Sequence, residues 1–421
     1  MIKLILFILL LTSAVFGQSR QELYKKETLE INLALQNKDF KTAIFHFNLA
    51  DSLRPNTYSI LYNLAACYAL DNNSAKSIST LRKILQLNTS TQFDADSDFI
   101  SIKSSPEYKK ILTEADALTK PINKCETAIE FQDNSFHPEG TAFDERSKKW
   151  ILGSIRQRRI VTVDSNGKTD SSFFEKSDNL FSVLGMKTDQ KNRKLWVASS
   201  AMEYMIDFSP ELKGKASIVR YNLDTGKIEK IYSIEGNHVF GDLIVAKNGT
   251  VYISDSGSPF LFCIDPKSNQ LTEFMNLEFG WNLQGLTFNE DESKIYIADY
   301  ISGIYLIDLK SKKVSEVNYS KSTSLRGIDG LYWYNNSLLA LQNGVAPFRV
   351  SRFFLDKKGT SILKDEVVMR NVPELNEPTL GFISKSKFYF ISNSPWSAYD
   401  RQLNFKPELS QKPLIMTYKL K

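Results

Sequence analysis

Two carboxylates in this sequence stand directly before a glycine at the start of an apolar stretch. Glu139 opens "EGTAF" and Asp329 opens "DGLYW", while Gln284 opens "QGLTF" and Gly241 with Asp242 opens "GDLIV". Carboxylate and amide oxygens are the ligands of hard divalent cations such as calcium, which takes about six to eight oxygens with water making up the number. A bound cation can polarise a carbonyl group and lower the pKa of a water molecule. The pattern therefore indicates a divalent-cation site as one interpretation of these residues.

These stretches belong to a unit that recurs from residue 126 onwards. Its signature is three apolar residues, then usually a small residue and Ser or Asp. The six copies are 150–154, 195–199, 251–255, 295–299, 338–342 and 388–392. An apolar stretch opening on glycine or a polar residue precedes each copy, and a hairpin turn rich in Asp, Gly and Lys follows most of them. Six such four-stranded units predict a six-bladed β-propeller over residues 126–421.

The segment 126–132 lies ahead of the first unit and has no blade of its own. The last strand, at 413–420, lacks an outermost partner. We therefore expect 126–132 to complete the sixth blade and close the ring, which removes the open sheet edge.

In a propeller the first strand of each blade lines the central channel, so the residues that open these strands surround one mouth. The residues expected at this mouth are Glu139, Gly185, Gly241, Asp242, Gln284, Asp329 and Thr379. Because strands in a blade are antiparallel, the loops after the second strands lie over the same mouth. Two of these loops, 200–216 and 394–412, are long and carry the aromatics Tyr204, Phe208, Trp396 and Tyr399. They are either lids that face an organic substrate or tolerated surface insertions.

Two of the three histidines, His137 and His238, stand just before channel strands. They are candidates for proton transfer near the mouth, and the alternative is a hydrogen-bonded structural histidine. Asp255 and Asp299 end second strands near the same mouth, where structural hydrogen bonds to turns are favoured. The sequence contains no G-x-S-x-G elbow, so a serine nucleophile of that type is not indicated.

The N-terminal part has a helical rather than an alternating period. Small, aromatic and proline residues fall at tetratricopeptide-repeat positions, namely Ala43, Phe47, Ala50, Pro55, Ala65 and Tyr68. Ser77 takes a position where alanine is usual. Residues 20–118 are therefore predicted to form a tetratricopeptide-like domain that docks a protein partner, joined to the propeller by a linker at 119–125. A plain bundle of helical hairpins is the alternative.

Residues 1–17 have the lysine, the short apolar run and the small residues of a secretory signal peptide. Export to the periplasm or the extracellular space is expected. No later stretch is long and apolar enough to span a membrane. The 53 basic and 48 acidic residues are interspersed, which does not favour nucleic-acid binding. The three cysteines, Cys67, Cys125 and Cys263, are too few for a disulfide framework, although one pair could bridge.

Residues 126–421 resemble the gluconolactonase and regucalcin (senescence marker protein) type of propeller, with paraoxonases and strictosidine synthases as distant relatives. The segments "PEGTAFD", "FGDLIVAKNGTVYISDS", "LQGLTFNEDESKIYIADY" and "IDGLYW" carry the resemblance. It implies a divalent metal, calcium or zinc, at the channel mouth and hydrolysis of lactones or esters. Glu139 and Asp329 match the two carboxylates of the family. Gln284 stands where the family usually has asparagine, and Gly241-Asp242 where it often has Asn-Asp.

The resemblance implies that Glu139, Gln284 and Asp329 are metal ligands. Asp329 would be ligand or general base, assisted by His137. Asp242, His238, Tyr204 and Trp396 would face the substrate. The competing hypothesis is a propeller and helical-repeat scaffold that binds a ligand, peptide or glycan without turnover, because fold does not determine function.

Overall fold

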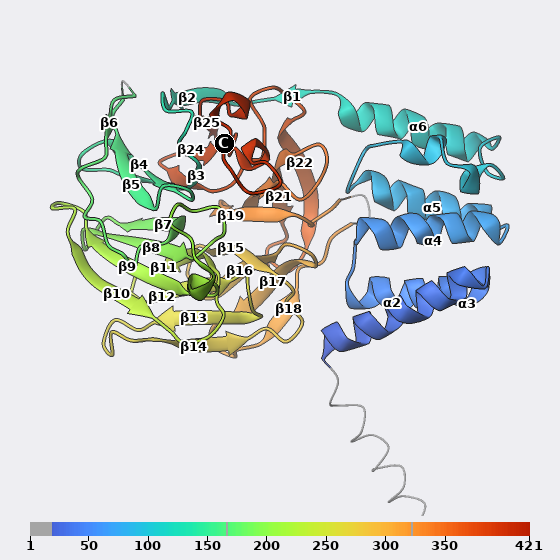
Figure 1. Cartoon of the computed structure of the whole chain (residues 1–421), viewed down its shortest axis with the longest axis horizontal. Coiled ribbons are helices and arrows are strands. Elements are labelled where there is room, and N and C mark those ends of the chain that lie inside the picture. The colour runs from blue at the N-terminus through green and yellow to red at the C-terminus, as the bar shows by residue number, and fades with distance from the viewer. Residues whose placement is uncertain (1–18, 166, 321–322) are drawn as a thin grey trace, which may run out of the picture. The chain divides into compact units, whose positions relative to one another are not determined.

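The computed structural model describes residues 19–165, 167–320 and 323–421. The predicted signal peptide, residues 1–17, lies outside these ranges. The chain forms two units, a helical unit that ends at Leu118 and a β unit from Thr119 to Lys421. Figure 1 shows the helices in blue to cyan and most of the sheets in green to red. Within the described ranges, no helix is both long and apolar enough to cross a membrane.

The described part of the helical unit contains five α-helices, the first four joined by short connections and the last two by a longer segment. Their bounds are α2 Arg20–Gln36, α3 Phe40–Leu53, α4 Tyr58–Leu70, α5 Ser74–Leu85 and α6 Pro106–Thr119. Two 3-10 turns, Gln92–Asp94 and Ser97–Phe99, lie between α5 and α6. The side chains of Ser19, Asp39 and Asn73 accept backbone N–H groups at the starts of α2, α3 and α5. These caps satisfy donors that the first helical turn leaves open, so the sequence itself sets the helix starts.

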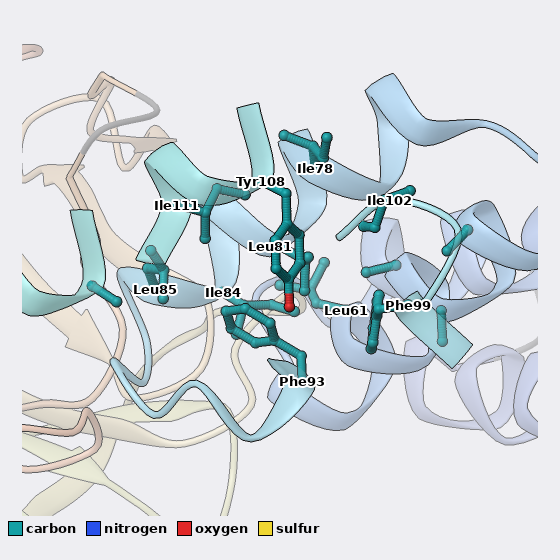
Figure 2. Close-up of a cluster of buried hydrophobic side chains, with 14 of the residues drawn as sticks. Leu61, Ile78, Leu81, Ile84, Leu85, Phe93, Phe99, Ile102, Tyr108 and Ile111 are labelled. Carbon is teal, nitrogen blue, oxygen red and sulfur yellow. The ribbon is translucent and has the colours of Figure 1, made fainter. Parts of the chain in front are cut away.

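Large apolar side chains fill the space between the later helices, as Figure 2 shows. Leu81, Phe93 and Phe99 are fully buried there, and Tyr108 packs edge-on against Phe93 with ring centroids 6.0 Å apart. Where α4 and α5 approach, the hydroxyl of Ser77 donates to the backbone carbonyl of a residue on α4 at 2.8 Å. Helical hairpins are thus present, while their assignment to the tetratricopeptide family stays a prediction.

The Ser77 contact gives a first test of this packing. Ser77→Ala is expected to lower the local stability of α4 and α5 by about 1 kcal/mol, because one buried hydrogen bond is lost. Ser77→Leu should cost about 1–3 kcal/mol, because the helices meet with no room for a larger side chain. Native-state hydrogen exchange of the full chain measures both. Ser79→Ala, on the exposed face of the same helix, is the control and should stay within about 0.5 kcal/mol of wild type.

The β unit is a six-bladed propeller, as the sequence predicts. The strands of each blade are given with the inner strand first. The first blade consists of β3 Pro138–Asp144, β4 Lys149–Ser154, β5 Arg159–Val163 and β6 Thr169–Asp170, and the second of β7 Ser182–Asp189, β8 Lys194–Ser200, β9 Ala216–Asn222 and β10 Ile228–Ser233. The third consists of β11 Phe240–Val245, β12 Val251–Asp255, β13 Phe260–Ile264 and β14 Leu271–Asn276. The fourth blade consists of β15 Leu283–Phe288, β16 Lys294–Asp299, β17 Gly303–Asp308 and β18 Val314–Glu316. The fifth contains β19 Ile328–Tyr334, β20 Ser337–Gln342, β21 Arg349–Leu355 and β22 Ile362–Arg370. Every pairing within these sheets is antiparallel.

The sixth blade closes the ring with a strand from the other end of the β unit. It consists of β23 Gly381–Ser384, β24 Lys387–Ile391, β25 Leu414–Lys419 and β2 Glu126–Glu130. The pairing of β2 with β25 confirms the predicted closure by segment 126–132. The fifth blade also gains an outer strand, β1 Ile122–Asn123, which pairs with β22. Part of the segment expected to be a linker, 119–125, is therefore an edge strand.

The glycines that follow the polar residues at the channel let neighbouring inner strands approach closely. A Cβ atom on Gly140 would lie 1.9 Å from the carbonyl oxygen of Leu184, and one on Gly285 would lie 2.5 Å from the carbonyl oxygen of Asp329. No side chain fits at these distances. The repeated pair of a polar residue and a glycine thus packs one inner strand against the next and holds the polar residue at the channel.

Candidate functional site

The inner strands bulge beside the polar residues singled out in the sequence. The pairing of β3 with β4 shifts register between Pro138 and Thr141, and the pairing of β15 with β16 shifts between Leu283 and Leu286. The same occurs between Ile328 and Gly330 in β19. A bulge leaves residues outside the hydrogen-bond ladder, bends the strand and redirects a side chain. The residues left outside the ladder include Glu139, Gln284 and Asp329, which explains why the sequence motif and the channel mouth coincide.

A cavity of ≈ 340 Å³ lies at this mouth. Its polar lining residues are Glu139, Ser256, Asn282, Gln284, Tyr300, Asp329, Asn343 and Glu377. Its apolar lining residues and glycine are Leu184, Met202, Val239, Gly241, Leu380 and Trp396. The structure therefore brings together the three predicted metal-ligand residues and Trp396. No Lys, Arg or His is among these lining residues.

Glu139 is 5% exposed and is held from the lid side of the cavity. Its Oε2 atom accepts a hydrogen bond from Trp396 Nε1 at 3.2 Å and one from Ser394 Oγ at 3.4 Å. Burial raises the pKa of Glu139 well above its usual range, and the charges of Asp329 and Glu377 add to this effect. The two hydrogen bonds favour the ionised form but do not offset burial.

Asp329 is also buried, and its position is fixed by a chain of hydrogen bonds. Asn343 Nδ2 donates to Asp329 Oδ2 at 2.8 Å, and the hydroxyl of Tyr300 donates to Asn343 Oδ1 at 2.8 Å. Burial raises the pKa of Asp329; the Asn343 hydrogen bond opposes the rise and the charge of Asp242 adds to it. Asn343 directly follows β20. Because second strands end at this mouth, Asn343 could have been predicted there from the sequence.

Glu377 is a third carboxyl of the cavity, and the sequence analysis missed it. It precedes β23 in a loop and has a φ of 62°, a backbone conformation that is costly for a residue with a side chain and is often found at functional sites. Burial raises the pKa of Glu377 to about 7, with a further contribution from the charge of Asp329. Neither the backbone conformation nor the burial has a local sequence signal.

Gly241 and Gln284, the two positions that differ from the pattern of the propellers this sequence resembles, lie beside each other. A Cβ atom on Gly241 would lie 2.6 Å from Ser256 Oγ and 3.3 Å from Gln284 Oε1. The longer Gln284 side chain thus extends towards space that a side chain at position 241 would need. Gln284 Nε2 donates to Asn282 Oδ1 at 2.6 Å, which leaves the carbonyl oxygen of Gln284 for another partner.

The donor set of the cavity suits a hard cation. Its ligand atoms are all oxygens, which calcium or magnesium prefers, whereas zinc usually takes His or Cys as well. No group of three or more His, Cys, Asp or Glu side chains that could hold a metal ion occurs in the described residues. A cation would therefore combine at most two of the carboxylates with an amide oxygen such as that of Gln284, and with water.

His137 packs beside the lid and does not line the cavity. It is fully buried, its Nδ1 lies 2.7 Å from the Tyr399 hydroxyl, and its ring meets Trp396 edge-on at 4.5 Å. Burial lowers the pKa of His137 to about 3, and the charge of Arg156 lowers it further. The imidazole is therefore neutral at pH 7, and its role in proton transfer stays a prediction.

Tyr204 joins the two long loops at the mouth. Its ring meets Trp396 edge-on at 5.0 Å and Tyr399 at 4.9 Å. Only Trp396 of these three lines the cavity. The loops 200–216 and 394–412 therefore contact each other through aromatic rings beside the mouth. Their role as a substrate-facing lid stays a prediction.

Two other predicted mouth residues have partners elsewhere. His238 Nδ1 lies 2.7 Å from Asp255 Oδ2, and neither residue lines the cavity. Asp255 also accepts from the Val239 and Gly257 backbone amides, a structural role that the sequence favours. Asp242 is 1% exposed and its Oδ1 pairs with Lys187 Nζ at 3.0 Å.

No protein-family model matches this chain, and no curated protein does. Among solved structures, it is similar to a gluconolactonase from Xanthomonas campestris at 14% identity, with 72% of this chain and 92% of that chain covered and a TM-score of 0.48. It is also similar to the PQQ-bound aldose sugar dehydrogenase of Streptomyces coelicolor at 11% identity, covering 71% and 99%, TM-score 0.47. A virginiamycin B lyase from Staphylococcus aureus matches at 13% identity, covering 70% and 99%, TM-score 0.46. Similarities this distant carry no information about the reaction.

Proposed function

We propose that the cavity at the propeller mouth hydrolyses lactones or related esters with the help of a hard divalent cation held by Glu139, Gln284 and Asp329. One observation carries the proposal: two buried carboxyls and a half-buried one, all with raised pKa values, share a cavity that no cationic side chain lines. Burying like charges together costs free energy, and strongly perturbed carboxyls in a cleft mark candidate functional sites. A cation would offset this cost.

The residues of the cavity have distinct roles in this proposal. A bound divalent cation supplies polarisation of the substrate carbonyl and a more acidic water. Trp396 orients Glu139, and Asn343 with Tyr300 orients Asp329. Glu377 is the proton acceptor for the attacking water, because a pKa near 7 suits a general base at neutral pH.

The apolar wall of the cavity favours a substrate with an apolar part. This wall is formed by Leu184, Met202, Val239 and Leu380, and the carboxyls are the only charged groups among the residues that line the cavity. The aromatic contacts of the lid favour the second candidate, binding of such a ligand without turnover. Export of the protein and docking of a partner by the helical unit stay predictions.

The test is elemental analysis of the purified full chain combined with hydrolysis assays on a panel of γ- and δ-lactones and aryl esters. Retention of about one calcium or other divalent ion per chain and chelator-sensitive hydrolysis are expected. A protein that retains no divalent ion at millimolar calcium, magnesium or zinc, and that hydrolyses nothing in the panel, would contradict the proposal. Saturable binding of a panel compound without hydrolysis would favour the second candidate.

The carboxyls also predict how stability depends on pH. The folded state holds protons on Glu377 up to about pH 7, whereas the unfolded chain releases them near the ordinary value for glutamate, about 4.3. The contribution of Glu377 to the free energy of unfolding is therefore greatest below about pH 4 and is lost as the pH rises through about 7. In chelator, the Tm of the β unit should fall by a few degrees between about pH 5 and pH 8.5.

Differential scanning calorimetry in chelator and in saturating calcium measures this effect. Calcium should flatten the decrease, because the bound ion favours the ionised carboxylates. Glu377→Gln is the matched variant and should lose part of the pH dependence in chelator. A Tm that rises between pH 5 and 8.5 in chelator would show the opposite linkage.

A further inference from the structure

A second cavity, of ≈ 370 Å³, lies at the other end of the channel. The lining residues that matter here are Phe143, Met186, Lys187, Tyr332, Phe382 and Lys385. Glu139 opens β3 at the first mouth whereas Phe143 lies near the end of the same strand, and Asp329 and Tyr332 are similarly separated on β19. The two cavities therefore occupy opposite mouths. None of the residues assigned to the hydrolytic site lines this second cavity.

Its walls are aromatic and supported from behind. The rings of Phe143 and Phe382 are nearly parallel, with centroids 6.0 Å apart and an interplanar angle of 8°. Trp150 contacts both rings, at 5.2 and 5.6 Å. A cluster packed this way keeps its shape, and it provides a flat apolar surface for the ring of a ligand.

Lys187 provides a positive group with unused hydrogen-bond donors. Its ammonium donates one hydrogen bond, to Asp242 Oδ1 at 3.0 Å, and lies 5.5 Å from the centre of the Tyr332 ring. An ammonium has three N–H donors, so two remain without a protein partner among the described residues. The side chain is 19% exposed, and the residue lines the cavity. Asp242 thus fixes the Lys187 ammonium at the cavity, and two of its N–H groups remain able to bind an anion.

The other charged groups of the cavity do not compete for that place. Glu145 is engaged by the Ser384 hydroxyl and lies 3.1 Å from Lys148 Nζ. Lys385 is exposed and adds positive charge at the rim. An apolar cavity with a few placed polar groups and a volume of this size is typical of small-molecule sites.

We propose that this second cavity binds a small aromatic carboxylate, with its ring on Phe143 and Phe382 and its carboxylate on the Lys187 ammonium. Charge complementarity selects the acid over a neutral aromatic compound, and the aromatic wall selects it over a short aliphatic acid. The site is separate from the one proposed for the cation and the hydrolysis, and the two are linked through the charge of Asp242, which acts on Asp329 at the first mouth.

The probe is 3-phenylpropionate, titrated into the full chain by isothermal calorimetry and ligand-observed NMR. Its neutral amide and acetate are the comparison ligands. We expect saturable binding at one site per chain, about tenfold tighter than for the amide, which corresponds to one charge-assisted hydrogen bond at about 1.4 kcal/mol per factor of ten. Equal affinity for acid and amide, or no saturable binding of the acid up to about 10 mM, which corresponds to a binding free energy weaker than about −3 kcal/mol, overturns the proposal.

Variants locate the site. Lys187→Met combined with Asp242→Asn removes both charges of the buried pair, which avoids leaving one unpaired, and should abolish the preference for the acid. Phe382→Ala should weaken acid and amide alike. Trp396→Ala, at the first mouth, should leave acid binding unchanged. If Trp396→Ala abolished binding of the acid while the double variant kept it, the ligand would lie at the first mouth, and the proposal would be overturned.

Discussion

Glu139→Gln and Asp329→Asn are each expected to lower kcat/KM for lactone hydrolysis by about 10²–10⁴-fold, because a bound metal ion contributes several kcal/mol of charge stabilisation. Both substitutions keep the shape of the side chain and remove one negative charge. Each should also remove stoichiometric calcium from the purified protein, since at most two of the carboxylates contribute to one ion. Initial rates over a calcium titration, together with elemental analysis, measure the two effects separately.

Glu316→Gln is the matched control, because Glu316 lies exposed on β18, away from both cavities. It should change neither the rate nor the calcium content. If both Glu139→Gln and Asp329→Asn kept activity and calcium within about twofold of wild type, the cation would have to be held elsewhere. Trp396→Phe adds a finer test. It removes the hydrogen bond to Glu139 Oε2 while keeping an aromatic ring beside His137 and Tyr204, and should lower kcat/KM about tenfold, as the loss of a partner that orients a ligand does.

The ring of six blades could be predicted because each blade repeats the same local pattern of apolar strands and turns. The placement of Glu139 and Asp329 was also predictable, because the glycine after each of them marks the close approach of inner strands. The short strand β1 was not, because the two residues that form it have no pattern of their own. Its position is given by pairing with β22, a partner more than two hundred residues away.

The rest of the cavity depends on features without a local signal. Glu377 reaches it from a loop with a positive φ, whereas the prediction placed Thr379 at the mouth. Thr379 lies fully buried beside Glu139, to whose carbonyl oxygen its hydroxyl donates, and it does not line the cavity. The neutral state of His137 follows from complete burial beneath packed side chains, which no single sequence reveals.

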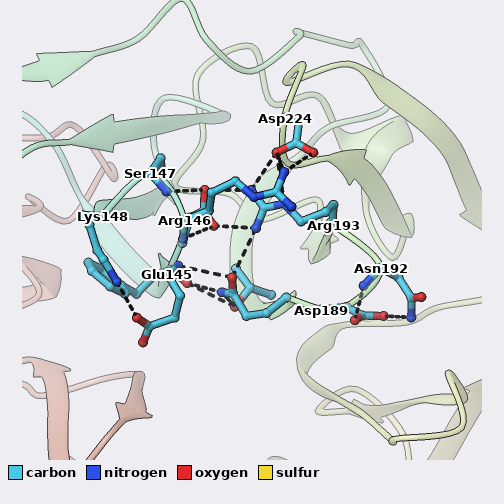
Figure 3. Close-up of polar contacts among 12 residues, drawn as sticks. Glu145, Arg146, Ser147, Lys148, Asp189, Asn192, Arg193 and Asp224 are labelled. Atoms are coloured by element: carbon cyan, nitrogen blue, oxygen red, sulfur yellow. Dashed lines mark hydrogen bonds and ion pairs between the residues drawn. The ribbon is translucent and has the colours of Figure 1, made fainter.

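Arg193→Ala is expected to destabilise the β unit by about 3–5 kcal/mol, because it leaves a buried carboxylate without its ion-pair partner. Arg193 donates to both oxygens of Asp144, at 2.6 and 2.9 Å. It also donates to Asp224, a contact that Figure 3 shows. The Asp144 and Arg193 side chains are only 5% and 13% exposed. Burial alone would raise the pKa of Asp144, but the hydrogen bonds from Arg193, from the Ser147 side chain and from the backbone amides of Arg146 and Ser147 outweigh it, so that the pKa lies well below its usual range.

Arg146→Ala is the matched control, since Arg146 pairs with the same Asp224 in an exposed position, and it should cost less than about 1 kcal/mol. Urea unfolding followed by tryptophan fluorescence reports on the β unit. Asp144→Asn combined with Arg193→Met should cost less than Arg193→Ala, because no unpaired charge remains in the interior. This ordering separates a penalty for an orphaned charge from a simple loss of packing, which would make the double variant the least stable of the three.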